Sequence, residues 1–171
     1  YVQALVAENS PLTPFEVRQI HRLVLTQIDE ENAGQYRKVP VRIAGSAHTP
    51  PEAWELTRLM QEWGDWIAAQ AQILHPVVRA ALAHHRLAAI HPFIDGNGRM
   101  GRLFITFYLC WKGILARPLL YLSIYLKTHR EEYHLFVRIL AGDLDSIQRR
   151  IHHAHIAAAC FGGEQITRRP R

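Results

Sequence analysis

The sequence is poor in cysteine: Cys110 and Cys160 are the only two among 171 residues. Two cysteines cannot form the dense disulfide framework of a small secreted domain. Both lie in apolar stretches with helical spacing, where a thiol behaves as a small hydrophobic side chain. We therefore expect buried thiols, a reducing compartment and a cytoplasmic location.

Long apolar runs, internal repeats and low-complexity segments are missing as well. No uninterrupted apolar stretch approaches the roughly 20 residues that span a membrane, and no secretory signal is visible. No convincing linker divides the chain. We therefore expect a single domain over residues 1–160, followed by a basic tail at 161–171.

The charge balance is mildly basic, with a formal net charge of +5. An excess of this sign is compatible with nucleic-acid binding. However, the basic residues are dispersed, and three arginines fall in the last four positions. A solvated basic terminus is the commoner explanation of such a run, so a nucleic-acid partner is not expected.

Apolar residues recur with helical spacing along most of the chain, which predicts an all-α fold. The expected helices lie at about 14–28, 52–72, 76–90, 102–112, 129–141 and 144–160. In the second of these, Trp54, Leu59, Trp63 and Trp66 form a stripe that we expect to pack in the core. In the third, Val78, Ala81 and Leu82 are expected to face inward.

One short segment alternates instead. Val39, Val41 and Ile43 are separated by less apolar residues and lie between Gly34 and Gly45, which predicts a strand within a hairpin. A lone hairpin in a helical protein keeps an open edge, and such an edge can accept an extended peptide through main-chain hydrogen bonds. The alternative is a surface hairpin without a partner.

The chain contains 11 histidines, so a zinc site has to be considered. His84, His85 and His91 are close in sequence, but none of them forms the i, i+4 pair of a metalloprotease. No cysteine or acidic ligand lies beside them at metal spacing. The same holds for a second group at His152, His153 and His155. Structural or surface roles are therefore expected for both groups.

The most informative segment is HPFIDGNGRMGR, residues 91–102. Proline after His91 disfavours helix, and the two glycines at 96 and 98 permit a tight turn. Apolar residues at helical spacing then follow, so the segment is expected to be a loop that opens into a buried helix. Phe93 is expected to anchor that loop in the core.

The start of this helix is electrostatically unusual, because Arg99 and Arg102 replace the acidic residues that a helix N-terminus prefers. Two guanidinium groups, unpaired amides and the helix dipole converge there, which favours a bound phosphate chain. Asp95 would hold a divalent cation on those phosphates, and His91 would act as a general base. The alternative is a structural loop whose arginines pair with carboxylates.

These residues resemble the Fic family (filamentation induced by cAMP), whose signature is H-x-F-x-[DE]-G-N-G-R-x-x-R. All its fixed positions are present: His91, Phe93, Asp95, Gly96, Asn97, Gly98, Arg99 and Arg102. Residues 34–51 resemble the family's target-docking flap, and the resemblance covers about residues 1–160. It implies a Fic-type helical bundle with a short β-hairpin flap at about 36–50.

The resemblance implies a protein adenylyltransferase, which transfers AMP from ATP to a Ser, Thr or Tyr hydroxyl of a target protein. His91 would take the hydroxyl proton, and Asp95 would hold Mg²⁺ between the α- and β-phosphates. The amides of 96–98 and the Asn97 side chain would hold the same phosphates, while Arg99 and Arg102 bind the β/γ end. The flap residues that meet the target would be Arg42, Ile43, Ala44 and Gly45.

Two features depart from the family pattern. The sequence contains no inhibitory helix of the form [ST]-x-x-x-E-[GN], whose glutamate pairs with the second motif arginine. We expect that element upstream of Tyr1 or on a partner protein. At the adenine site, Tyr133 is the candidate wall, but Leu140 stands where relatives have Asn.

Two alternatives remain at this stage. One is another phosphotransfer on the same loop or the removal of AMP from a protein, although Gly98 disfavours the kinase-like Doc branch and AMP removal usually needs the missing glutamate. The other is a non-catalytic module that binds peptides at the flap.

Overall fold

The computed structural model describes residues 2–8, 12–44, 46, 48–69, 74–117, 124–125, 128–129 and 131. Within them lie five α-helices: α1 (Val2–Ala7), α2 (Pro14–Leu25), α3 (Leu56–Ala68), α4 (Pro76–Ile90) and α5 (Asn97–Trp111). A short 3₁₀ helix, η1 (Ala53–Glu55), leads into α3. The described part of the chain contains no strand, so the all-α prediction is confirmed. None of its helices is long and apolar enough to cross a membrane.

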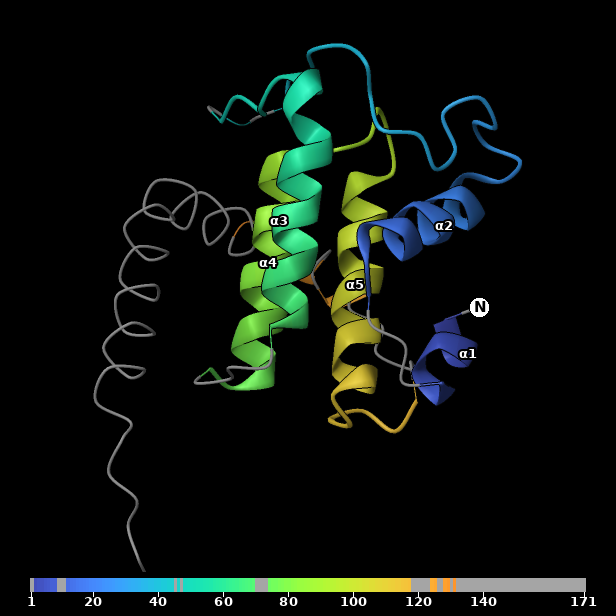
Figure 1. Cartoon of the computed structure of the whole chain (residues 1–171), viewed down its shortest axis with the longest axis vertical. Coiled ribbons are helices and arrows are strands. Elements are labelled where there is room, and N and C mark those ends of the chain that lie inside the picture. The colour runs from blue at the N-terminus through green and yellow to red at the C-terminus, as the bar shows by residue number, and fades with distance from the viewer. Residues whose placement is uncertain are drawn as a thin grey trace, which may run out of the picture.

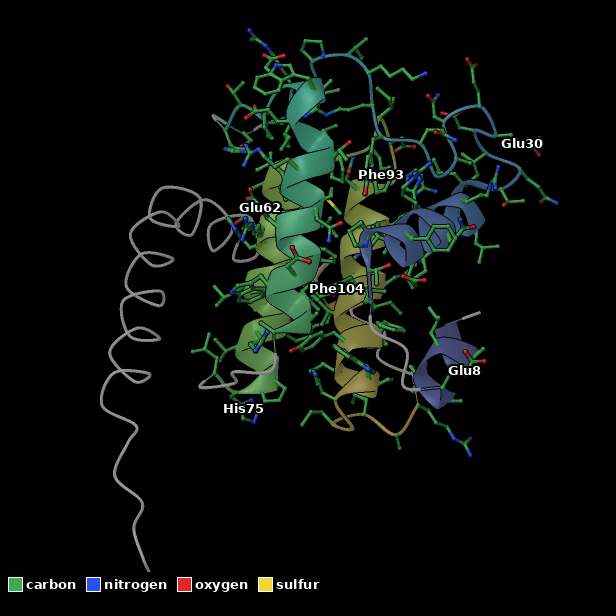
Figure 2. All side chains as sticks on the ribbon, in the orientation of Figure 1. Glu8, Glu30, Glu62, His75, Phe93 and Phe104 are labelled. Atoms are coloured by element: carbon green, nitrogen blue, oxygen red, sulfur yellow. The ribbon has the colours of Figure 1, made fainter. Side chains whose placement is uncertain are left out.

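Helices α3, α4 and α5 stand side by side, with α4 packed against both of the others (Figure 1). Large side chains fill the space between them, and Trp63, Phe104, Phe107 and Tyr108 are almost completely buried. Phe104 lies midway along this packed group in Figure 2, and its ring centroid is 5.1 Å from that of Trp63. This core fixes the helix pair that carries the 91–102 segment.

Helix α2 crosses the group and begins with a capping box. The Thr13 side chain accepts a hydrogen bond from the N–H of Phe15, and the Glu16 side chain accepts one from the N–H of Thr13. Gly64 of α3 lies against this start, because a Cβ there would come within 2.8 Å of the Pro14 ring. The cap and the close approach together set where α2 meets the bundle.

Buried arginine closes the far end of α3. The Arg79 side chain, only 4% exposed, donates to the carbonyls of Trp66, Ile67 and Ala69. These carbonyls have no partner within the helix, so a cation suits them in both hydrogen bonding and charge.

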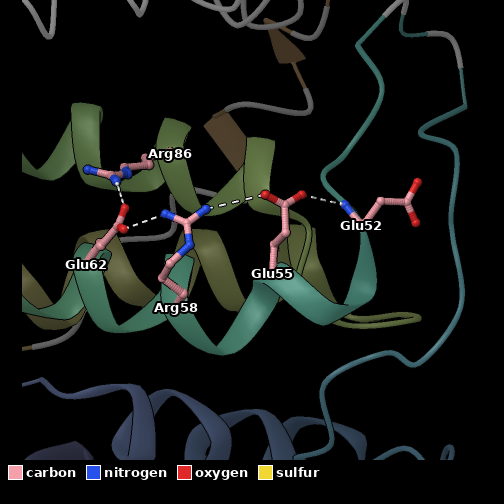
Figure 3. Close-up of polar contacts among 5 residues, drawn as sticks. All are labelled: Glu52, Glu55, Arg58, Glu62 and Arg86. Atoms are coloured by element: carbon pink, nitrogen blue, oxygen red, sulfur yellow. Dashed lines mark hydrogen bonds and ion pairs between the residues drawn. The ribbon is translucent and has the colours of Figure 1, made fainter.

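The outer face of α3 carries a chain of ion pairs (Figure 3). Arg58 bonds Glu55 and Glu62, and Glu62 also meets Arg86 of α4 at 3.4 Å. The Arg58 side chain is 58% exposed, and exposed pairs contribute little stability. These ion pairs link α3 to α4 but contribute little to the stability of the fold.

Several sequence expectations are corrected at this level. Trp54 is 79% exposed and Val78 is 45% exposed, because the buried faces run through Met60, Trp63 and Ile67 in α3, and through Ala80, Ala83, Leu87 and Ile90 in α4. Ile28 follows the end of α2 and is 61% exposed. The helix expected from residue 102 begins at Asn97.

The remaining predictions either are confirmed or concern residues outside the described part of the chain. The helix over 76–90 has the expected bounds, and Phe93 and Cys110 are buried. Residues 132–171, with Tyr133, Leu140, Cys160, the second histidine group and most of the two last predicted helices, lie outside the described residues.

Candidate nucleotide site at the start of α5

A six-residue loop, 91–96, joins the end of α4 to the start of α5. Both of its ends have positive φ, at +49° for His91 and +79° for Gly96. The glycine adopts this conformation without cost, whereas a histidine in the left-handed region is strained and marks a constrained site. Figure 2 places Phe93 of this loop at the opposite end of the bundle from His75, which caps α4.

Asn97 holds the loop closed from within. Its side-chain oxygen accepts from the N–H of Phe93 at 3.0 Å, and its side-chain nitrogen donates to the Phe93 carbonyl at 2.8 Å. Phe93 itself is completely buried. The structure therefore gives the Asn97 side chain a partner other than the phosphate we expected, and leaves its backbone N–H in the first turn of α5.

His91 has its ring nitrogens in distinct roles. Nδ1 lies 3.3 Å from the Ala88 carbonyl, which can only accept, so the proton is on Nδ1 and Nε2 is the basic nitrogen. Burial lowers the pKa of His91 below 6.5, the Ala88 carbonyl opposes this, and the charges of Arg37 and His48 lower it further. A neutral imidazole with a basic Nε2 at pH 7 is what a general base requires.

Arg37 fixes the backbone around His91, and the sequence analysis missed this residue. Its Nε donates to the His91 carbonyl and its N–H to the Pro92 carbonyl, both at 2.9 Å. Its two terminal nitrogens donate to the carbonyls of Val39 and Pro51. The side chain is 3% exposed, and a buried guanidinium satisfied by carbonyls has a structural reason to be arginine.

The same contacts bring the flap to the loop. His48 also bonds the carbonyl of Ala89, two residues before His91. Figure 1 accordingly shows the segment between α2 and α3 passing over the end of the bundle where α4 connects to α5. The structure thus brings Arg37, His48 and Pro51 beside the end of α4 and the start of the 91–96 loop.

The hairpin itself is corrected, because the described flap residues, 36–44, 46 and 48–50, form no strand. Val41 and Ile43 are half-buried while Arg42 and Ala44 are exposed, but Val39 is 52% exposed, so the alternation is kept only over residues 41–44. A strand needs a ladder partner, and Pro40 offers no N–H. Within this segment, the Ser46 N–H donates to the Ile43 carbonyl at 3.1 Å, which is a turn and not a ladder hydrogen bond. Gly45 lies outside the described residues.

Asp95 lies in the loop, two residues before the first residue of α5. One carboxylate oxygen accepts from the N–H of Gly96 at 2.5 Å, and the other pairs with Arg99 at 2.9 Å. The Asp95 side chain is 62% exposed, so both contacts lie at the surface. An anion is therefore already held by an amide and a guanidinium at the helix start.

Arg102 lies over the same turn. A Cβ at Gly98 would come within 3.3 Å of its guanidinium, so glycine at 98 leaves room for that side chain. The structure thus brings His91, Asp95, Gly96, Asn97, Gly98, Arg99 and Arg102 together at one helix start. The predicted adenine wall, Tyr133, lies outside the described residues.

A histidine that was not among the predicted site residues also supports the loop. His21 of α2 is completely buried, bonds the Asp95 carbonyl and stacks on Phe93. Its position one residue after Ile20 on the apolar face of α2 signalled burial but not its partner.

Residues 11–109 match the Fic/DOC family. The chain belongs to this family. Among its relatives, the protein adenylyltransferase Fic of Drosophila grimshawi is 35% identical over 153 residues, which are 88% of this chain and 30% of that protein. The protein of the same name from Aedes aegypti is 36% identical over 154 residues. The chain thus spans less than a third of the length of these relatives.

Solved structures agree with this assignment. A Fic domain containing signalling protein from Bacteroides thetaiotaomicron is 34% identical, with a TM-score of 0.58 over 66% of this chain and 44% of that one. A Fic family protein from Desulfovibrio desulfuricans is 26% identical, with a TM-score of 0.67 over 83% of this chain and 43% of that one. The Fic-type helical fold expected from the sequence is confirmed.

Proposed function

We propose that this Fic domain transfers AMP from ATP to a hydroxyl side chain of a target protein. The observation that carries the proposal is the basic Nε2 of His91, held at the loop that ends in an anion-binding helix start. The similarity to proteins named protein adenylyltransferase Fic supports the same reaction.

The reaction needs one nucleophile, one base and one leaving group. The target oxygen attacks the α-phosphorus of ATP, and the bond from that phosphorus to the bridging oxygen breaks. Diphosphate leaves with the electron pair, and the hydroxyl proton passes to Nε2 of His91. Such phosphoryl chemistry depends mainly on positioning and charge stabilisation.

The start of α5 supplies that positioning. The first N–H groups of a helix have no intrahelical partner and suit phosphate oxygens. Gly96, Asn97 and Gly98 would offer these amides to the α- and β-phosphates. Arg99 and Arg102 would hold the β/γ end, so that the α-phosphorus faces the docked hydroxyl.

The donor set at this turn fits Mg²⁺. The Asp95 carboxylate is an exposed hard-oxygen ligand, and Mg²⁺ typically combines one or two carboxylates with substrate phosphates. The described residues hold no cluster of three or more His, Cys, Asp or Glu that could bind a metal without a substrate. When bound, the ion would neutralise charge on the α- and β-phosphates.

The flap would present the target. Residues 42–44 lie in a segment without a ladder partner that is tied to the loop through Arg37. A target segment that adds to this edge through main-chain bonds would bring its hydroxyl to His91 with little demand on its sequence. ATP and a protein hydroxyl are therefore the proposed partners, and the chain itself is one possible target.

The test uses ATP labelled at the α-phosphate or, separately, at the γ-phosphate, incubated with this protein and cell lysate. Label retained on protein from the α-position alone supports AMP transfer, and its absence in His91→Ala confirms that the chemistry belongs to this site. Label from the γ-position alone identifies a kinase. Loss of AMP from premodified protein identifies the reverse reaction, and no turnover despite target binding identifies a binding module.

A further inference from the structure

His21 connects three parts of the molecule that are far apart in sequence. Its Nδ1 accepts from the N–H of Gly34 at 3.0 Å, and its Nε2 lies 2.9 Å from the Asp95 carbonyl. Because an N–H can only donate and a carbonyl can only accept, the ring is neutral with its proton on Nε2. Burial also lowers the pKa of His21, which favours the neutral ring.

The ring has no freedom to turn. It stacks on Phe93 with centroids 3.6 Å apart and planes 5° apart. Gly96 also lies close to the ring, because a Cβ there would come within 3.0 Å of Nε2. The donor is therefore aimed at one point on the loop, the carbonyl of Asp95.

That bond sets the direction of the next amide. The peptide between Asp95 and Gly96 is trans, so its carbonyl and its N–H point to opposite sides. With the carbonyl held inward by His21, the Gly96 N–H points outward, where it donates to the exposed Asp95 carboxylate. An anion therefore already occupies the position that this N–H faces.

We propose that His21 is a positioning residue that keeps the Gly96 N–H turned toward the phosphates of the nucleotide. The proposal rests on the proposed function and adds a residue outside the 91–102 segment. Glycine tolerates both signs of φ, so nothing in Gly96 itself prevents the peptide from turning over. A turned peptide would present a carbonyl to the phosphates, and the donor would be lost.

Two substitutions separate the bonds of His21. In His21→Gln the side-chain nitrogen reaches roughly as far as Nε2 and can still donate to Asp95. In His21→Asn the amide reaches only as far as Nδ1, so it can accept from Gly34 but not donate to Asp95. Each variant keeps one bond and loses the other, and both lose the stacked ring.

The control for general destabilisation is Ile67→Ala. Ile67 is buried in the last turn of α3, and its carbonyl accepts a hydrogen bond from Arg79, near the start of α4. From Arg79, α4 extends for about 20 Å before it reaches the 91–96 loop, so Ile67 is far from the site. Ile67→Ala should have a lower melting temperature than the wild type but the same kcat at temperatures where the variant is folded.

The measurements are kcat and KM for AMP transfer, melting temperature, and binding of Mg²⁺ with tripolyphosphate followed by the Gly96 amide signal in NMR. We expect His21→Asn to lose about 10²-fold in kcat, the cost of one misplaced donor, and to lose the Gly96 response to tripolyphosphate. His21→Gln should stay within several-fold of Ile67→Ala in kcat and keep that response.

Equal losses in His21→Asn and His21→Gln, or losses no larger than in Ile67→Ala, would overturn the proposal. If His21→Asn does not fold, His21→Gln decides: a 10²-fold loss of kcat or a silent Gly96 amide contradicts it. If the wild-type protein transfers no AMP, the proposed function fails, and the tripolyphosphate response still tests His21.

Discussion

His91 joins two properties that a general base needs, a defined tautomer and a depressed pKa. The Ala88 carbonyl fixes the first, and burial with nearby positive charge produces the second. We expect His91→Ala to lower the rate of AMP transfer by about 10²- to 10⁴-fold with nearly unchanged ATP affinity and melting temperature. His75→Ala, which removes an exposed histidine at the other end of α4, is the control: it should lower the melting temperature through loss of the cap and keep full activity where it is folded. Wild-type turnover in His91→Ala would contradict the assignment of the base.

The depressed pKa of His91 also predicts the shape of the pH profile. The neutral ring is active, and its pKa lies below 6.5, so activity should persist at pH 6.5 and fall only as the pH drops through that lower value. The measurement is kcat/KM between pH 4.5 and 8, with melting temperatures at each pH to exclude unfolding. A rate that is already half lost at or above pH 6.5 would show that the pKa of the base is not lowered.

The individual residues show what sequence reasoning can and cannot reach. The motif residues at 91–102 were found because their chemistry is unusual at a helix start. Arg37 and His21 were missed because each acts through carbonyls, and main-chain partners leave no trace in side-chain spacing. For the same reason, Asn97 was assigned to phosphate when its side chain closes the loop on Phe93.

The apolar periodicity predicted where helices form more reliably than it predicted which face of each helix is buried. Proline at position 76 fixed the start of α4, whereas the predicted inward face lay about half a turn from the buried one, since Ala80 and Ala83 are buried and Val78 is exposed. In a helix one position is a turn of 100°, and small apolar residues on both sides leave the phase undetermined. The prediction of a flap hairpin failed for a different reason: alternation predicts an extended chain, but a strand forms only when a neighbouring strand pairs with it through main-chain hydrogen bonds.

The flap segment gives the next prediction. Ile43→Pro removes a backbone donor from the open edge and restricts the chain, so target modification should fall at least tenfold while ATP affinity changes little. Ile43→Val keeps the N–H and the half-buried apolar side chain, and should behave like wild type. The assays are target modification and ATP binding measured side by side. Equal loss of both in Ile43→Pro would indicate unfolding or a flap that serves the nucleotide.

These 171 residues contain no full match to the inhibitory sequence [ST]-x-x-x-E-[GN], although residues 4–9, ALVAEN, fit its last two positions with Glu8 and Asn9. By resemblance to the family, a segment of this type would place a carboxylate on Arg102 and compete with the γ-phosphate for the guanidinium. We expect such a peptide, added in excess, to lower the initial rate and raise the apparent KM for ATP. The same peptide with Gln in place of Glu is the control, and equal inhibition by both peptides would rule out the carboxylate.

Arg37 has a consequence for how the two ligands are bound. One guanidinium is shared between the carbonyl of His91 and that of Pro51, so the nucleotide loop and the base of the flap cannot shift independently. Two ligands that stabilise the same arrangement of a shared connector bind cooperatively, and thermodynamic linkage makes the coupling equal in both directions. ATP should therefore tighten target binding by the factor by which the target tightens ATP. Arg37→Lys, which keeps the charge and loses the planar fork, should reduce both factors together.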